Sequence, residues 1–164
     1  MKLIERHKIL FIVAVLALLA AAGVFLFIYH FHTSDVTALT DFSAAYHNFD
    51  QAVSDFSTLV QAPDSAGAPA ADSLEQKADA ALAELKTKAS VRISSLVEHD
   101  AEIMNLTAEI SDLSAKELAT LKEYRRTAAD KNAASADTLA QAADFKYQRQ
   151  TDYARFRQLL RLNE

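Results

Sequence analysis

The fold is decided by residues 39–60, which read LTDFSAAYHNFDQAVSDFSTLV. Large apolar residues recur in this stretch at alternating steps of three and four, the spacing that places side chains on one face of an α-helix. Another helix must cover this face, because its aromatic rings would otherwise be exposed to water. We therefore expect a helix over residues 35–61 with a seam formed by Leu39, Phe42, Tyr46, Phe49, Val53 and Phe56.

Short polar and helix-breaking segments mark the expected ends of this helix. Residues 33–35 are Thr, Ser and Asp, whose side chains can accept hydrogen bonds from the free N–H groups of a first helical turn. Both prolines of the chain and one of its two glycines lie within residues 62–71. Proline and glycine are costly inside a helix, so this segment predicts a loop that reverses the chain between antiparallel helices.

The overall composition favours an all-α protein. Alanine, the best helix former, occurs 32 times, and the 95 residues after Pro69 contain neither glycine nor proline. This scarcity of turn residues excludes a many-stranded sandwich or barrel and a glycine-rich phosphate loop. The absence of cysteine excludes disulfides, cysteine-containing zinc sites and thiol nucleophiles.

Downstream of the loop we expect long helices over residues 72–131 and 134–162. A second seam continues the steps of three and four, with His99 among its positions, and a five-residue step from its last leucine to Leu118 predicts a bend or a stutter near residues 114–117. Whether these helices fold back as a bundle or run on as a rod is left open. The apolar residues of the second seam are Leu96, Ile103, Leu106, Ile110 and Leu113.

Aromatic residues are placed at the two ends of the region after residue 33. None occurs between Ser57 and Glu123, whereas several lie on either side of this gap. Packing the first helix of the region against the last would bury both groups. We therefore expect Phe49 and Phe56 to lie near Phe145 and Phe156.

The N-terminus contains an apolar run that predicts a membrane span. Residues 9–29 form 21 consecutive positions without a charge, enough for a helix of about 30 Å, which is the thickness of the hydrocarbon core of a bilayer. Three basic residues against one acidic residue precede the run, so the positive-inside rule places residues 1–8 in the cytoplasm. We expect an uncleaved signal-anchor over residues 9–31, with membrane-anchoring side chains Ile9, Leu16, Leu19, Phe25 and Tyr29.

The alternative is a cleaved signal peptide, since small residues at positions 20–22 precede Gly23. Cleavage there would leave five large apolar residues at the start of the mature chain, so we favour the anchor. Residues 33–164 would then form an extracytoplasmic helical domain, periplasmic if the protein is bacterial.

The charge pattern restricts the chemistry of this domain. Residues 33–164 carry 14 basic and 21 acidic residues, a net charge of −7 that argues against nucleic-acid binding. We recognise no catalytic constellation, metal-ligand set or cofactor motif, and expect no enzyme, metal or cofactor. A candidate basic contact surface comprises Lys146, Arg149, Arg157 and Arg161, unless these residues simply belong to the last bundle helix and offset its dipole.

A single anchor followed by a helical domain is similar, at fold level, to the ectodomains of bacterial membrane sensors. The sequence favours a single-pass membrane protein that acts through contacts with a protein partner or with further copies of itself, as a structural, scaffold or accessory subunit of an envelope complex. The alternatives are a bundle that senses a small molecule or pH, and a cleaved secreted helical protein; a small-molecule ligand is left open.

Overall fold

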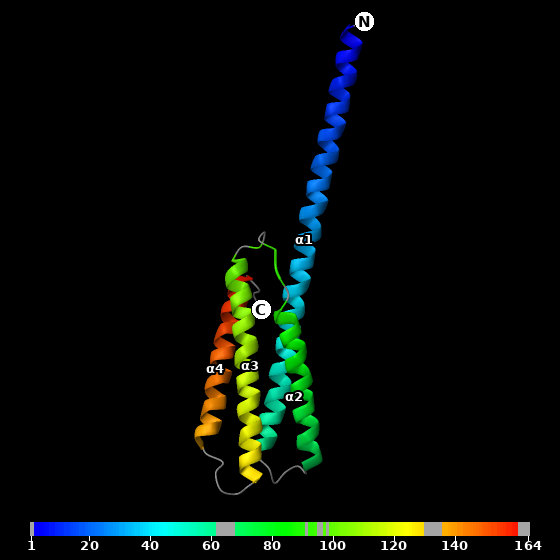
Figure 1. The fold of residues 1–164 in the computed structure, drawn as a ribbon. Helices are drawn as coiled ribbons and strands as arrows, with labels where there is room; N and C mark the ends of the chain where they lie inside the picture. The colour runs from blue at the N-terminus through cyan, green and yellow to red at the C-terminus, as the bar shows by residue number, and fades with distance from the viewer. Residues whose placement is uncertain are drawn as a thin grey trace. The chain divides into compact units, whose positions relative to one another are not determined.

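The computed structural model is all-helical within the part of the chain that it describes (Figure 1). It describes residues 2–61, 68–90, 92–94, 97, 99–129 and 136–160, with side chains from residue 15 onward except 31, 32, 68 and 129. The helices are α1 (Lys2–Gln61), α2 (Ala68–Ala89), α3 (Asp100–Ala129) and α4 (Ala136–Leu159). They divide into two compact units, Met1–Thr37 and Ala38–Glu164.

The first unit is the N-terminal part of α1 and exposes its apolar side chains. Leu16, Leu19, Phe25 and Tyr29 have exposed fractions between 60% and 69%, whereas the side chain of Ile9 lies outside the described set. Helix α1 contains a stretch long and apolar enough to cross a membrane. The large apolar side chains described between residues 15 and 29 are therefore not covered by other parts of the chain.

The expected helix start at residue 35 is wrong, because α1 runs through this position from Lys2. The Thr33 hydroxyl donates hydrogen bonds to the carbonyl oxygens of Tyr29 and His30 at 2.6 and 3.2 Å. Threonine can bond backward to the preceding turn as well as cap a new helix. Here it bonds backward, so residues 33–35 do not interrupt α1.

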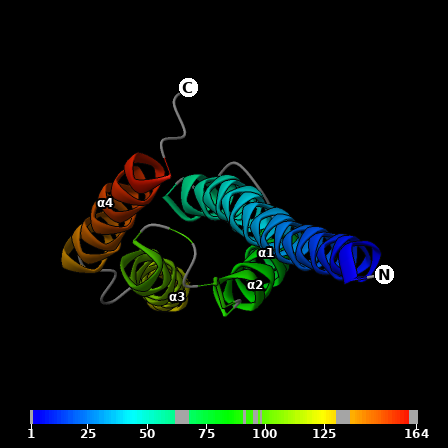
Figure 2. The same ribbon diagram turned by 90° about the horizontal axis from the view of Figure 1, so that it is seen from above.

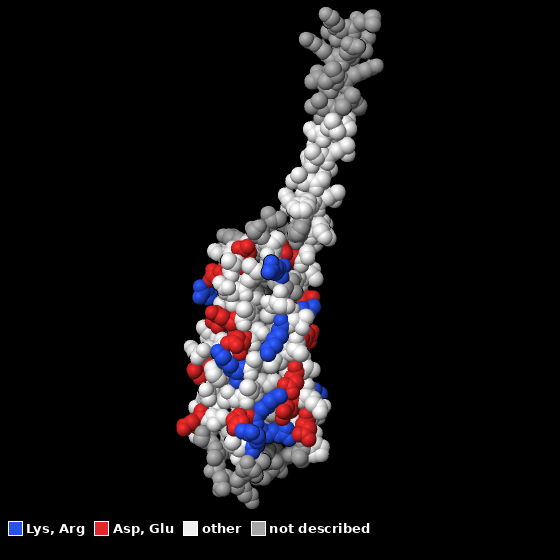
Figure 3. Space-filling model, in the orientation of Figure 1, with Lys and Arg blue, Asp and Glu red and all other residues white. Residues whose placement is uncertain are grey.

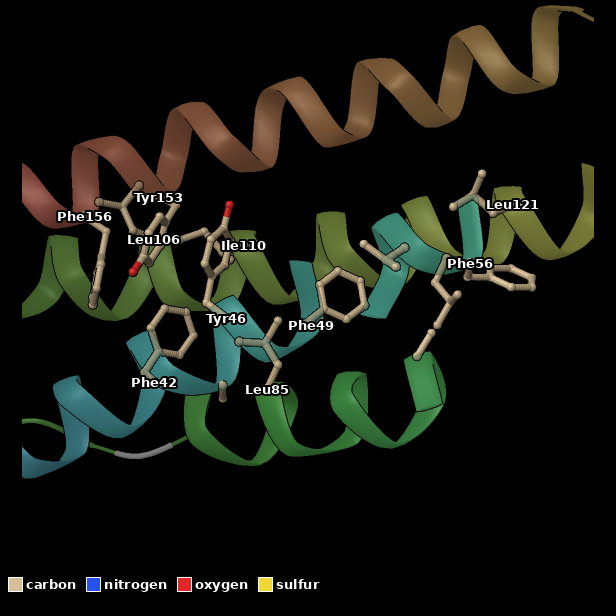
Figure 4. Close-up of a cluster of buried hydrophobic side chains, with 14 of the residues drawn as sticks. Phe42, Tyr46, Phe49, Phe56, Leu85, Leu106, Ile110, Leu121, Tyr153 and Phe156 are labelled. Atoms are coloured by element: carbon tan, nitrogen blue, oxygen red, sulfur yellow. The ribbon is translucent and has the colours of Figure 1, made fainter. Parts of the chain in front are cut away.

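The second unit is built around the seam of residues 39–60. All six predicted seam residues of this stretch are buried, and Phe49, Val53 and Phe56 have no exposed area. Side chains from α2, α3 and α4 complete the core around them (Figure 4). Seen from above, α2, α3, α4 and the C-terminal part of α1 lie around a common centre (Figure 2). The core residues contributed by the other three helices are Ala78, Leu85, Ile103, Leu106, Ile110, Leu118, Leu121, Ala142, Tyr153 and Phe156.

Contacts between α1 and α4 confirm that the first helix of this unit packs against the last, although the rings that meet are not the expected pairs of Phe49 and Phe56 with Phe145 and Phe156. The Phe42 and Phe156 rings meet edge to face with centroids 5.1 Å apart, and the Tyr46 and Tyr153 rings stack at 3.6 Å. Residue numbers rise along α1 as those of their partners fall along α4. Phe145 is only half-buried and does not belong to the core cluster.

The expected helix over residues 72–131 is wrong. Helix α2 begins earlier, at Ala68, with Pro69 in the first turn, where its missing N–H costs nothing. It ends at Ala89, where the Ser90 hydroxyl donates to the Thr87 carbonyl at 2.7 Å, and α3 begins only at Asp100. Serines and β-branched residues favour such local alternatives to the helix, so the chain reverses here without glycine or proline.

This reversal also removes His99 from the second seam. His99 lies just before α3 with a φ of 62°, and its carbonyl accepts a hydrogen bond from the Ile103 N–H at 2.9 Å. Its side chain is half exposed, which corrects the expectation that it lies in a helix interface. Leu96, the first residue of that seam, lies outside the described residues.

At the expected bend or stutter near residues 114–117, α3 continues unbroken to Ala129, and a stutter is compatible with a continuous helix. The buried stripe of α3 passes from Ile110 to Ser114 and Glu117, whereas Leu113 is only half-buried. The Ser114 hydroxyl is satisfied by the Ile110 carbonyl at 2.7 Å. Two polar residues thus continue the seam, and the leucine spacing alone misses them.

Candidate functional site

A fully buried arginine joins three helices of the second unit. Arg149 of α4 has no exposed side-chain area. Its Nε donates to Glu117 Oε2 of α3 at 2.9 Å, and one terminal nitrogen donates to Asp50 Oδ1 of α1 at 2.8 Å. The guanidinium carbon lies 5.1 Å from the Tyr46 ring centroid and 5.2 Å from that of Phe49. We call Arg149, Glu117 and Asp50 the ionic cluster.

The positions of these residues on their helices explain why they meet. Arg149 lies seven residues after Ala142 and four before Tyr153, so it falls on the buried stripe of α4. Glu117 lies on the buried stripe of α3, next to Leu118. Asp50 follows Phe49 at the edge of the α1 seam and keeps 35% of its side chain exposed. The cluster therefore combines a buried cation, a buried carboxylate and a carboxylate that reaches solvent.

Burial and pairing have opposing effects on the charges of the cluster. Burial disfavours the charge on Arg149, but the carboxylates of Glu117 and Asp50 outweigh it and raise the pKa of the guanidinium. Burial also raises the pKa of Glu117, and the attraction of Arg149 only partly offsets this effect. The remaining terminal nitrogen, Nη1, is buried without a hydrogen-bond partner. Arg149 thus stays charged, while Glu117 accepts a proton more readily than an exposed glutamate.

A chain of hydrogen bonds between α1 and α4 lies beside the ionic cluster. The Tyr153 hydroxyl lies 2.6 Å from Ser43 Oγ and 3.0 Å from His47 Nε2. Burial raises the pKa of Tyr46, which stacks on Tyr153, so the Tyr46 phenol remains protonated at neutral pH. The His47 ring nitrogen can accept from the Tyr153 hydroxyl or donate to it, depending on its tautomer.

Ion pairs cover the outer side of α2 and α3. Lys122 Nζ lies 2.6 Å from Asp79 Oδ1, and Arg125 pairs with both Asp72 and Glu75 at 2.5 and 2.6 Å. Charges of both signs are also visible over the face of this unit that Figure 3 shows. Exposed pairs of this kind contribute little each, so they mainly keep this side soluble.

Arg149 cannot belong to the candidate basic contact surface that we predicted. Arg149 is buried in the core, Lys146 and Arg157 are half-buried, and Arg161 lies outside the described residues. Among the described residues no group of three or more His, Asp or Glu side chains could hold a metal ion. No protein-family model, curated protein or solved structure matches the chain.

The raised pKa of Glu117 predicts how stability depends on pH. The folded chain binds this proton more tightly than the unfolded chain, so acidification from neutral pH towards 4.5, the ordinary pKa, favours folding at this residue. We expect the free energy of unfolding to rise, relative to that of Glu117→Gln, as the pH falls through this window. Urea unfolding of the full chain in mild detergent, followed by far-UV circular dichroism, measures it.

Glu123→Gln removes one exposed carboxylate from the same helix and controls for the general loss of charge. Its difference from the parent chain should stay nearly constant over the same pH range. A parent chain that loses stability relative to Glu117→Gln on acidification would contradict the assignment.

Proposed function

We propose that this chain is a single-pass membrane-anchored helical protein that acts through protein–protein contacts, as a structural, scaffold or accessory subunit of an envelope complex. The observation that carries the proposal is the contrast between its two units. Residues 15–29 expose large apolar side chains to their surroundings, whereas residues 38–160 bury their own core. Exposed apolar surface of this extent is stable in lipid but not in water.

The proposed topology places residues 1–8 in the cytoplasm, the span at residues 9–31 and an antiparallel helical bundle outside the cytoplasm. The basic residues before the span support this orientation. The uncleaved anchor is favoured over the cleaved secreted form because the apolar residues continue beyond Gly23. In a bacterium the bundle would occupy the periplasm.

Contacts with other proteins would involve the outer surface of the bundle. The seam predicted from the sequence is not available to a partner, because α2, α3 and α4 of the same chain bury Phe42, Phe49 and Phe56. Tyr147 is the one large hydrophobic residue exposed on the described part of the second unit. A partner would therefore recognise polar and small side chains rather than an open apolar groove.

Membrane extraction tests the anchor. We expect the full chain to remain with membranes in alkaline carbonate and to keep the mass of the uncleaved polypeptide. Leu16→Arg together with Leu19→Arg should release it, because an arginine near the middle of a span costs about 2.5–3.5 kcal/mol. Lys77→Ala, a surface change in α2, serves as the control and should leave the chain in membranes. A mature chain that begins near Gly23 would contradict the proposal.

A sensing accessory subunit is the second candidate function. It is favoured by the ionic cluster, which combines a buried nitrogen lacking a partner with a buried carboxylate of raised pKa. A change in protonation of Glu117 would alter how α3 and α4 are held together. The pH series with Glu117→Gln measures whether the bundle responds in this way.

A further inference from the structure

Continuous stripes on the outer faces of α1 and α4 lack charged residues, with the exposed Asp55 and Asp144 at their edges. On α1, positions at alternating steps of four and three are exposed, apart from the half-buried Ser54, and none carries Asp, Glu, Lys or Arg. On α4, positions at alternating steps of three and four are all exposed, and none of them carries a charged residue. We call the two sets the α1/α4 face. Its residues are Thr40, Ala44, His47, Gln51, Ser54 and Thr58 on α1, and Ala140, Ala143, Tyr147, Gln150 and Ala154 on α4.

The two stripes border each other. His47 lies at the boundary with α4, because its Nε2 reaches the Tyr153 hydroxyl. The opposite flank of α4 faces α3. Arg155 on this flank pairs with Glu102 of α3, and the pKa of Asp152 is raised by burial and by the nearby charge of Glu109 of α3. The stripe through Tyr147 is therefore on the flank away from α3, where α4 adjoins α1.

This absence of charge is unusual for a water-exposed surface on an acidic chain. The outer side of α2 and α3 is covered by ion pairs, including those of Lys122 and Arg125. The centres of protein interfaces, in contrast, are depleted of charged residues and enriched in tyrosine. Tyr147, with 70% of its surface exposed, lies in the middle of its stripe.

We propose that the α1/α4 face binds the same face of a second copy of this chain. Two copies anchored in one bilayer share an orientation, so identical faces can meet about a twofold axis normal to the membrane. Near this axis each residue meets its own counterpart, so a charged residue there would meet a like charge, which the stripes of the α1/α4 face avoid. Anchoring in the same membrane also raises the effective concentration of the second copy. This inference rests on the proposed membrane anchor and names the partner.

The face is large enough for a stable dimer. A helix of 24 residues, the length of α4, is about 36 Å long, and two adjacent helices about 9 Å apart present a face roughly 20 Å wide. Such a face covers roughly 700 Å² on each copy. The resulting total of about 1,400 Å² falls within the range of specific protein interfaces.

Cysteine crosslinking tests this contact directly, because the chain has no cysteine of its own. In membranes that contain the full chain, we expect Ala44→Cys, Gln51→Cys or Tyr147→Cys to form covalent dimers with a short bismaleimide. Ala80→Cys on α2 and Ala119→Cys on α3 are exposed controls and should not. Equal crosslinking at both sets of positions would reject the α1/α4 face.

A charge placed on the face provides an independent measurement. Gln51→Glu would oppose two carboxylates across the axis and should weaken the dimer by at least about tenfold in detergent titrations followed by mass. Gln76→Glu adds the same charge on α2 and should leave the dimer unchanged. Equal effects of the two variants would contradict the proposal.

The outcomes separate this inference from the proposed function. A chain that is monomeric but crosslinks through Ala44→Cys to a different protein would overturn the second copy and keep the function through protein contacts. A monomer that crosslinks to nothing would overturn both. A dimer found only for chains that have left the membrane would contradict the anchored arrangement.

Discussion

Replacing Arg149 with methionine is expected to lower the free energy of unfolding by about 3–5 kcal/mol, because it leaves Glu117 in the core without a counter-charge. Glu117 exposes only 4% of its side chain and cannot regain hydration without disrupting the packing of α3. Methionine keeps most of the volume, so the loss reports the charge rather than a cavity. Urea unfolding of the full chain in mild detergent measures the change.

The pair can also be removed as a whole. Combining Arg149→Met with Glu117→Leu should restore most of the lost stability, since buried ion pairs are often replaceable by well-packed apolar residues. The loss in Arg149→Met alone should also shrink at acidic pH, where Glu117 takes up a proton. A double variant as unstable as the single one would show that the ionic cluster does not act as a unit.

Replacing Phe49 with alanine is the second large expected loss, again about 3–5 kcal/mol. Phe49 has no exposed area and lies between the core and the guanidinium of Arg149, whose carbon is 5.2 Å from the ring centroid. Its removal creates a cavity and takes one aromatic face away from the buried cation. Thermal and urea unfolding of the full chain report the loss.

Phe49→Leu is the matched variant, because it keeps an apolar side chain of similar volume but no ring. We expect a loss of about 1–1.5 kcal/mol, within the range of volume-conserving changes. A leucine variant as unstable as the alanine variant would assign the effect to the ring and its contact with Arg149. Equal stability of Phe49→Ala and the parent chain would contradict the buried position of this residue.

The helical nature of the chain and the main seam could be predicted from the sequence, because large residues at steps of three and four have few alternatives. The pairing of α1 with α4 could be predicted from where the aromatic residues lie. The reversal at residues 90–99 could not, because no glycine or proline marks it. Where α2 ends, the Ser90 hydroxyl donates to the Thr87 carbonyl, a local bond that a serine can also make inside a helix.

The ionic cluster was missed for a different reason. By sequence, Arg149 belongs to the basic residues of its helix, and Glu117 lies in the segment where a bend or a stutter is expected. Both residues are polar, and a buried stripe is normally predicted from apolar residues alone. Their spacing nevertheless points to burial. Arg149 lies at a helical spacing of seven and four from Ala142 and Tyr153, and Glu117 lies at a spacing of seven and four from Ile110 and Leu121. Which charges share a core depends on contacts between distant helices, and a single sequence does not provide these.

The stacked rings of Tyr46 and Tyr153 give this protein an optical signature. The chain has no tryptophan and only five tyrosines, so its near-ultraviolet absorption comes mainly from phenol rings. Two of them lie face to face, with an interplanar angle of 9°. Coupled chromophores in a fixed chiral arrangement produce circular dichroism that vanishes when they separate. The docking of α4 on α1 can therefore be followed in solution without any added label.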